Sequence, residues 1–259
     1  MMELLAEGAD RLGFALDRNH LAQFERYYRE LVSWNQRFNL TAVTAYEQVQ
    51  QRHFVDSLTC MLALPGGPGQ DVPNHLPLQR TGQPLRCADV GSGAGFPGIP
   101  LAILMHDARF VLIESIQKKA GFLEHIVRTL GLANVRVMCV RAEDMGHSPD
   151  HRENYDVVLA RAVSAISTLA EYCLPLCRVG GRMIAPKGRE VAAELEEGAY
   201  AVDVLGGRLL CSKPLFVQGD EERRLVVIEK MAHTPERFPR NAGIPAKRPL
   251  QAPKATTEG

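Results

Sequence analysis

The strongest constraint on the fold is an alternation of apolar runs and helix-like segments that begins near residue 85. The apolar runs have the length that is typical of buried strands and lie at residues 85–90, 109–114, 135–140, 155–160 and 181–185. The helix-like segments lie at residues 98–105, 117–131, 166–177 and 190–205. This order predicts an α/β fold, in which helices cover both faces of a parallel sheet.

The end of the alternation differs from its beginning. Two further apolar runs, at residues 208–217 and 224–231, are separated only by Gln218 to Arg223. That connection is too short for a helical crossover, so the two runs are predicted to form an antiparallel hairpin at one edge of the sheet. The prediction is therefore a seven-stranded, mostly parallel sheet whose last strand is antiparallel.

The rest of the chain divides into three further segments. Residues 1–64 predict a helical extension, with one helix whose apolar face is formed by Leu21, Phe24, Tyr28, Leu31, Val32 and Trp34, and another at about 46–64. Residues 65–84 are rich in proline and glycine and predict a linker loop. Residues 85–231 form the predicted α/β domain, and residues 232–259 a basic, proline-rich and irregular tail.

Composition excludes several classes of protein. There are 30 Lys and Arg against 30 Asp and Glu, so any nucleic-acid contact must use a local basic patch. The sequence contains no run of 18 apolar residues, so we expect no membrane span. The acidic N-terminus does not resemble a secretory signal. We expect a cytoplasmic protein with reduced thiols and neither a metal site nor a disulfide partner, because the cysteines are scattered at 60, 87, 139, 173, 177 and 211.

A glycine-rich loop follows the first predicted strand. Gly91, Gly93 and Gly95 alternate in it, followed by Phe96, and Asp89 precedes it. Glycines at the carboxyl end of a parallel strand let the backbone approach a ligand, so the three glycines are predicted to bind a cofactor. The pattern lacks a P-loop lysine, and an acid before the loop suits a cationic ligand better than a pyrophosphate. The alternative is a tight turn without a ligand.

Two further strand ends carry acids. Glu114 ends the second strand about 20 residues past the loop, where a carboxylate can accept hydrogen bonds from ribose hydroxyls. Ala142 and Glu143 follow the third strand, where they can meet an adenine edge. Alternatives are a solvated acid at Glu114 and a helix N-cap at Glu143 or Asp144.

Five cationic or imidazole side chains are candidates for RNA contact: His53, Lys118, Lys119, Lys187 and Arg240. Lys118 and Lys119 oppose the dipole at the start of a predicted helix, which phosphate binding would explain, although a solvated face is the alternative.

Arg161 interrupts an apolar run at the end of the fourth strand, so we expect it to face the ligand crevice. The alternative for Arg161 is a surface salt bridge. His53 shares a helix face with Ser57, and that polar face is expected to turn toward the crevice.

The combination of motifs resembles the GidB/RsmG family of bacterial 16S rRNA guanine-N7 methyltransferases. The resemblance extends from about Tyr27 to Leu250. It rests on Trp34-Asn35, Asn39-Leu40-Thr41, His53 to Leu58, Asp89 to Pro100, Glu114-Ser115, Lys118-Lys119, Ala142-Glu143, Arg161-Ala162, Lys187-Gly188 and Phe238-Pro239-Arg240. It implies a Rossmann-like class I methyltransferase fold and S-adenosyl-L-methionine as the cofactor. It also implies cofactor contacts at Gly91, Phe96, Ala142, Glu143 and Arg161.

The implied substrate is 16S ribosomal RNA or the small ribosomal subunit. Guanine N7 carries a lone pair in the neutral base, so methyl transfer requires alignment and electrostatic support but no general base. We therefore assign no catalytic residue and expect Asp89 to be an acid near the cofactor. Two alternatives are a methyltransferase with another substrate and a non-catalytic nucleotide-binding regulatory module.

Overall fold

The centre of the molecule is a seven-stranded sheet with the order β3-β2-β1-β4-β5-β7-β6. The computed structural model describes residues 2–64, 82–161, 164–216 and 222–253. The strands are β1 (Arg86–Val90), β2 (Arg109–Ile113), β3 (Val135–Met138), β4 (Tyr155–Ala160), β5 (Cys177–Gly188), β6 (Gly207–Phe216) and β7 (Glu222–Lys230). Strands β1 to β5 pair in parallel, whereas β7 is antiparallel to both β5 and β6. The predicted fold class and edge hairpin are therefore confirmed.

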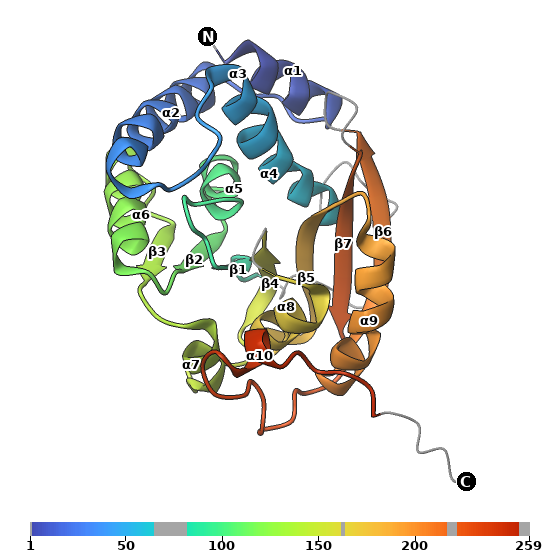
Figure 1. Ribbon diagram of the computed structural model, residues 1–259. Helices are drawn as coiled ribbons and strands as arrows, with labels where there is room; N and C mark the ends of the chain where they lie inside the picture. The colour runs from blue at the N-terminus through green and yellow to red at the C-terminus, as the bar shows by residue number, and fades with distance from the viewer. Residues whose placement is uncertain (1, 65–81, 162–163, 217–221, 254–259) are drawn as a thin grey trace, which may run out of the picture.

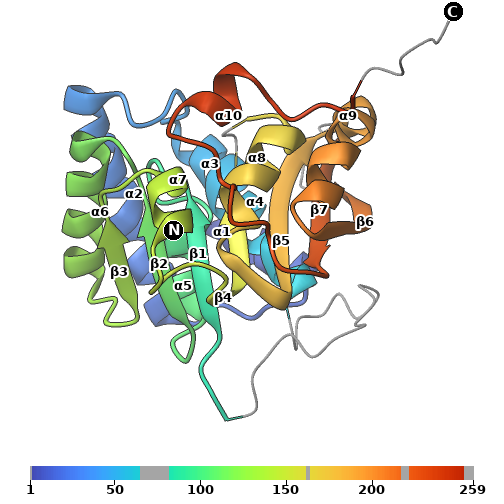
Figure 2. The same ribbon diagram turned by 90° about the horizontal axis from the view of Figure 1, so that it is seen from below.

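Helices cover both faces of the sheet (Figure 2). One face carries α5 (Gly98–Leu104) and α6 (Gln117–Leu130), which share a buried core with the N-terminal helices. The other face carries α7 (Ala142–His147), α8 (Ile166–Cys173) and α9 (Val191–Val204), which enclose a second core. Both cores hold fully buried aliphatic side chains, which supply the main driving force for folding.

The N-terminal extension packs on the face of the sheet that carries α5 and α6 (Figure 1). Its helices are α1 (Glu3–Arg11), α2 (Arg18–Phe38), α3 (Tyr46–Val49), a π-helix η1 (Gln50–Val55), α4 (Asp56–Leu58) and a 3₁₀-helix η2 (Thr59–Ala63). The start of α2 is fixed by Asp17, whose side chain accepts from the amide of His20 while the His20 ring accepts from the amide of Asp17. From α3 to η2 the chain is continuously helical but changes pitch, and the π-helix within it carries His53.

The tail beyond β7 forms a strap across the ends of α7 and α8 (Figure 1). It is mostly irregular, as predicted, with one short helix, α10 (Ile244–Lys247). Phe238 is 5% exposed and belongs to the core on the face of the sheet that carries α7, α8 and α9. The described part of the tail, up to residue 253, is therefore packed against the domain.

Two element boundaries differ from the sequence expectation by four residues. Helix α8 ends at Cys173 and β5 already begins at Cys177, where a helix to 177 and a strand from 181 were expected. Pro175 cannot continue the helix, and β5 contains an irregular register next to Gly180, whose φ is 79°. The short helix α7 was not predicted, and most of the predicted linker at residues 65–84 lies outside the described residues.

Candidate active site

The glycine loop joins β1 to α5 and turns at three glycines. Gly91, Gly93 and Gly95 have φ angles of 68°, 58° and 97°, in the left-handed region that L side chains rarely adopt. The amides of Gly91 and Ser92 both donate to the carbonyl of Ile113 at the end of β2. The loop is thus tied to the neighbouring strand with its backbone facing a crevice.

Two adjoining cavities form that crevice at the carboxyl ends of the central strands. The larger, of about 410 Å³, is lined by Leu40, Thr41, His53, Gly91, Ser92, Gly93, Ala94, Phe96, Glu114, Ser115, Lys119 and Arg161. The smaller, of about 170 Å³, is lined by Val90, Gly91, Ile113, Ser115, Val140, Arg141, Ala142, Glu143 and Tyr172. Gly91 and Ser115 line both, so the two cavities are halves of one site. Strand-end ligand sites of this kind are usual in open α/β sheets.

Glu114 links the glycine loop to the second strand. Its Oε2 accepts from the amide of Gly93 at 3.0 Å, and its Oε1 accepts from the amide of Ile116 at 2.8 Å. The side chain is 5% exposed and lines the larger cavity. Each carboxylate oxygen has a second lone-pair site, so Glu114 can still accept hydrogen bonds from a ligand.

Asp89 lies beneath the glycine loop and is not among the residues that line the crevice. Its Oδ2 accepts from the amide of Gly98 at 3.0 Å, whereas its Oδ1 has no hydrogen-bond partner within the described part of the chain. Burial, the largest effect, raises the pKa of Asp89 to about 7. The structure thus gives this acid a role in anchoring the start of α5.

One wall of the larger cavity is formed by charged and aromatic side chains. Arg161 Nη1 donates to Asp56 Oδ2 at 2.8 Å and to the carbonyl of Arg52 at 3.1 Å. The guanidinium lies 4.9 Å from the centroid of the Phe96 ring, a cation–π distance. Arg161 therefore faces the crevice as predicted, but its ion pair is internal and links β4 to the N-terminal extension.

His53 stacks on the same aromatic ring. The two ring centroids are 4.5 Å apart at an angle of 22°, and His53 Nε2 lies 2.9 Å from Thr41 Oγ1. Burial, followed by the nearby Arg161 charge, lowers the pKa of His53 to about 4. The imidazole that faces the crevice is consequently neutral at physiological pH.

Ala142 and Glu143 line the smaller cavity at the start of α7. Glu143 is in the first turn and is not the N-cap, because α7 begins after Arg141 and has no capping side chain. Glu143 Oε1 accepts from the amide of Gly243 at 2.7 Å, which connects the cavity to the strap. The cap alternative for Glu143 and Asp144 is therefore wrong.

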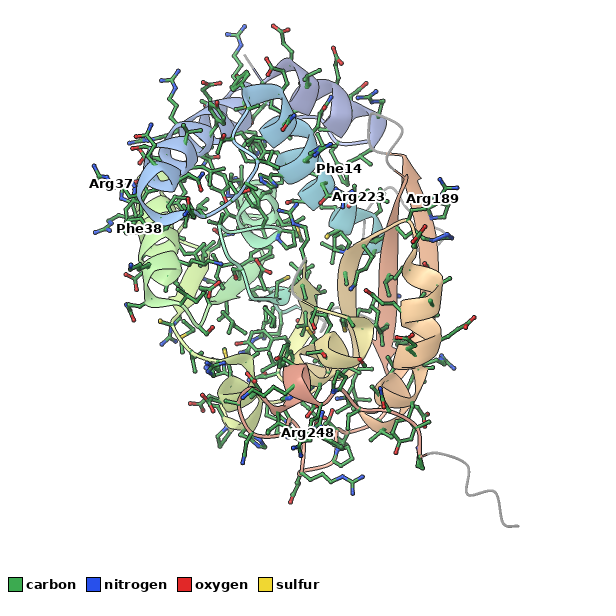
Figure 3. All side chains as sticks on the ribbon, in the orientation of Figure 1. Phe14, Arg37, Phe38, Arg189, Arg223 and Arg248 are labelled. Atoms are coloured by element: carbon green, nitrogen blue, oxygen red, sulfur yellow. The ribbon has the colours of Figure 1, made fainter. Side chains whose placement is uncertain are left out.

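The predicted cations are placed differently from one another. Lys118 and Lys119 lie in the first turn of α6, and Lys119 lines the larger cavity. The Lys118 ammonium is 6.0 Å from the centroid of the Phe38 ring. Phe38 is the last residue of α2 (Figure 3). Lys187 instead pairs with Glu194 at 2.7 Å and donates to the carbonyl of Ser164.

Arg240 is also committed to an internal contact. Its guanidinium and backbone amide bind the carboxylate of Glu171, which is 0% exposed. The structure thus gives Lys187 and Arg240 internal partners and leaves Lys119 beside the crevice.

Sequence reasoning missed Tyr27 and assigned Gly95 to the ligand. Gly95 lines neither cavity, and a Cβ there would lie 2.6 Å from the hydroxyl of Tyr27 and from Ile99 Cδ1. Tyr27 was missed because the apolar face of its helix was drawn through Tyr28. An aromatic residue flanked by a second tyrosine gives no signal for which ring is buried.

Other classes of site find no support in the described residues. Within residues 2–64, 82–161, 164–216 and 222–253, no three His, Cys, Asp or Glu side chains lie together as metal ligands. Among the helices of that part of the chain, none is long and apolar enough to cross a membrane.

Comparison with known proteins identifies the family. A family model described as GidB, rRNA small subunit methyltransferase G, matches residues 20–223. The chain belongs to the rRNA small subunit methyltransferase G family. Ribosomal RNA small subunit methyltransferase G from Roseiflexus sp. (strain RS-1) is 47% identical over 249 residues, covering 96% of this chain and 100% of that relative. The same-named protein from Dehalococcoides mccartyi (strain CBDB1) is 45% identical over 250 residues, covering 96% and 100%.

Solved structures agree at the level of the fold. A crystal structure of a mutant of MtNAS superposes with a TM-score of 0.51 at 14% identity, covering 83% of this chain and 75% of that chain. At that identity the likeness concerns the fold alone.

Membership in this methyltransferase family makes the chain an S-adenosylmethionine-dependent enzyme. The residues of the crevice fit that cofactor. The three left-handed glycines keep the loop backbone free of side chains, and Glu114 retains acceptor capacity beside it. A Cβ on Gly93 would meet only the carbonyl of Gly91, at 3.8 Å, so the space above the loop is open.

Proposed function

We propose that this methyltransferase transfers the methyl group of S-adenosylmethionine to N7 of a guanine in 16S ribosomal RNA, in the cytoplasm. The observation that carries the proposal is the two-part crevice at the ends of β1, β2 and β4, with one half next to the N-terminal extension. Relatives that carry the small subunit methyltransferase name match this chain over their full length. Both halves of the crevice are therefore expected to function as they do in those relatives.

The residues divide between the two halves of the crevice. Glu114 is proposed to accept hydrogen bonds from the cofactor ribose, and Ala142 and Glu143 to border the adenine in the smaller cavity. Gly91 and Gly93 permit close approach of the loop backbone, and Phe96 and Arg161 border the larger cavity. When bound, the cofactor supplies an electrophilic methyl group on a sulfonium.

The remaining catalytic task is alignment of the guanine. N7 has its lone pair in the neutral base, so no proton must be removed before attack. His53 is neutral and fixed by Thr41 and Phe96, and it is proposed to border the target base rather than to act as a base. Lys118 and Lys119, at the start of α6, are proposed to contact RNA phosphate. The N-terminal extension and the α/β domain thus contribute together to the RNA site.

Mass mapping of 16S rRNA tests the proposed function. Ribosomal RNA from a deletion strain is expected to lack one methylated guanine, and the purified protein is expected to restore it on either naked 16S rRNA or small subunits. Comparing those two substrates also decides which is used. Restoration of no 16S position, together with methylation of a protein or small molecule, would contradict the proposal.

Loss of the Glu114 carboxylate is expected to weaken S-adenosylmethionine binding. Glu114→Ala removes the acceptor for the ribose and the contact to the Gly93 amide, for an expected loss of about 1.5–3 kcal/mol, or roughly 10- to 100-fold in Kd. Isothermal titration of the cofactor in the absence of RNA measures it. Glu124→Ala, an exposed acid on α6, is the control and is expected to bind normally. Normal binding by Glu114→Ala would remove this acid from the cofactor site.

The rate of methyl transfer is expected to be independent of His53 titration between about pH 6 and 8. Burial and the nearby Arg161 charge lower the pKa of folded His53 to about 4 from its ordinary value of 6.5, so the imidazole stays neutral across that range. The unfolded chain takes up the proton first, so this group lowers the free energy of unfolding as pH falls from 6.5 toward 4. Single-turnover rates of wild type and His53→Gln measure the kinetic effect. A limb near pH 7 that disappears in His53→Gln would reveal a general base.

A further inference from the structure

Tyr27, in the middle of α2, reaches from the N-terminal extension to the glycine loop. Its hydroxyl donates to the carbonyl of Ala94, and its ring stacks on Phe96 with centroids 5.4 Å apart at 26°. The side chain is 0% exposed and also contacts the Phe54 ring, at 5.4 Å. Burial raises the pKa of Tyr27 well above its usual value, so the hydroxyl remains a hydrogen-bond donor at any working pH.

The glycine loop depends on side chains that hold it from outside. Glu114 holds the amide of Gly93 from β2, and Asp89 holds the amide of Gly98 from β1. Ala94 lies between two glycines of positive φ, Gly93 and Gly95, where the backbone itself has the fewest steric restraints. The Tyr27 hydroxyl fixes the carbonyl at that point.

The absence of a side chain at Gly95 is matched to the same contact. A Cβ at Gly95 would lie 2.6 Å from the Tyr27 hydroxyl, so the glycine makes room for this tyrosine. The neighbouring Phe96 is shared, because His53 stacks on it in the crevice while Tyr27 stacks on it within the core. Tyr27 therefore contacts the loop at Ala94 and at Phe96, the two residues that flank Gly95.

We propose that Tyr27 is a positioning residue that holds the glycine loop in its cofactor-binding conformation, so that the N-terminal extension is an integral part of the S-adenosylmethionine site. The residue does not line the crevice and acts through Ala94 and Phe96. Without the hydroxyl the buried carbonyl of Ala94 loses its donor, and the loop populates its binding-competent conformation less often. The apparent affinity for the cofactor falls in proportion to the fraction of molecules whose loop is in the binding-competent conformation. The inference concerns cofactor binding and holds whichever base is methylated.

Tyr27→Phe and Tyr28→Phe form a matched pair for the experiment. Each removes one hydroxyl from α2, and the Tyr28 hydroxyl donates to the carbonyl of Thr44, away from the loop. For Tyr27→Phe we expect about a tenfold rise in the cofactor Kd and KM, with kcat at saturating cofactor unchanged within about twofold. Tyr28→Phe is expected to leave Kd and KM unchanged.

Hydrogen exchange in the absence of cofactor gives a readout that does not depend on activity. The amides of Gly95 and Phe96, which donate to the carbonyl of Ser92, are expected to exchange faster in Tyr27→Phe and at the wild-type rate in Tyr28→Phe. Unchanged exchange and affinity in Tyr27→Phe would overturn the proposal. Equal losses of affinity in both variants would overturn it as well, because they would indicate general destabilisation of α2. Loss of kcat without a change in KM would also contradict positioning of the cofactor loop.

Discussion

Arg240→Met is expected to lower the free energy of unfolding by about 3 kcal/mol while leaving the RNA affinity of the folded protein unchanged. The guanidinium binds both oxygens of Glu171, with Nε to Oε1 at 2.9 Å and Nη2 to Oε2 at 2.6 Å. Glu171 is 0% exposed, so removal of its partner leaves a buried carboxylate with only the backbone amide of residue 240. Urea unfolding measures the loss, and RNA binding measured below the transition tests the second part.

A double-mutant cycle separates this ion pair from other effects of the strap. Arg240→Met combined with Glu171→Gln is expected to recover most of the stability, because no buried charge is then left unpaired. Arg237→Met is the matched control on the same strap, because this arginine is exposed and its guanidinium lies over the ring of the neighbouring Phe238, at 5.1 Å. Arg240→Met could instead destabilise the protein no more than Arg237→Met and also weaken RNA binding. That outcome would indicate that Arg240 contacts RNA.

The strap connects this ion pair to the cofactor crevice. The amide of Gly243, three residues beyond Arg240, donates to Glu143 at the edge of the smaller cavity. Truncation after Met231 removes this donor and is thus expected to weaken cofactor binding. A tail that contacted RNA alone would leave the cofactor affinity intact.

Gly95→Ala is expected to lower the free energy of unfolding by about 3 kcal/mol and to weaken S-adenosylmethionine binding by at least about tenfold. The new Cβ would lie 2.6 Å from the Tyr27 hydroxyl and from Ile99 Cδ1, and φ at this position is 97°. Both neighbours are 0% exposed, so neither can move without disturbing the core. Urea unfolding of the purified variant measures the free energy of unfolding, and isothermal titration calorimetry measures the affinity for S-adenosylmethionine.

Gly131→Ala is the matched control for backbone strain. Gly131 has a φ of 67° at the end of α6, and a Cβ there would have no atom within 4 Å. Its expected cost is about 1 kcal/mol, with normal cofactor binding, because only the left-handed conformation is penalised. Equal stability losses in the two variants would show that the clash with Tyr27 and Ile99 is relieved by small movements.

The sequence determined the sheet and the strand-end half of the site. Strand length and the spacing of helix-like segments are local properties, so all seven strands and the edge hairpin followed from the pattern. Gly91 and Glu114 could be predicted as neighbours because carboxyl ends of adjacent parallel strands meet at one edge of a sheet. Gly91 directly follows β1 and Glu114 directly follows β2, so the strands alone bring them together.

The partners of the other candidate residues were decided only by the tertiary structure. Arg161 pairs with Asp56 across 105 residues, and Glu143 accepts from Gly243 across 100. No periodicity encodes such pairs, because they depend on how the extension and the strap dock on the sheet. For the same reason the sequence did not show that Arg240 pairs with the buried carboxylate of Glu171.

The position of Tyr27 shows most clearly what helical periodicity in the sequence cannot predict. Helical spacing placed an apolar face on α2 but assigned Tyr28 to it, whereas Tyr27 is 0% exposed and Tyr28 is only partly buried. Adjacent residues on a helix differ by about 100° in direction, so a small error in the face exchanges one tyrosine for the other. Which hydroxyl reaches the glycine loop is fixed by the docking of α2 against α5 and Phe54, and that arrangement exists only in the folded chain.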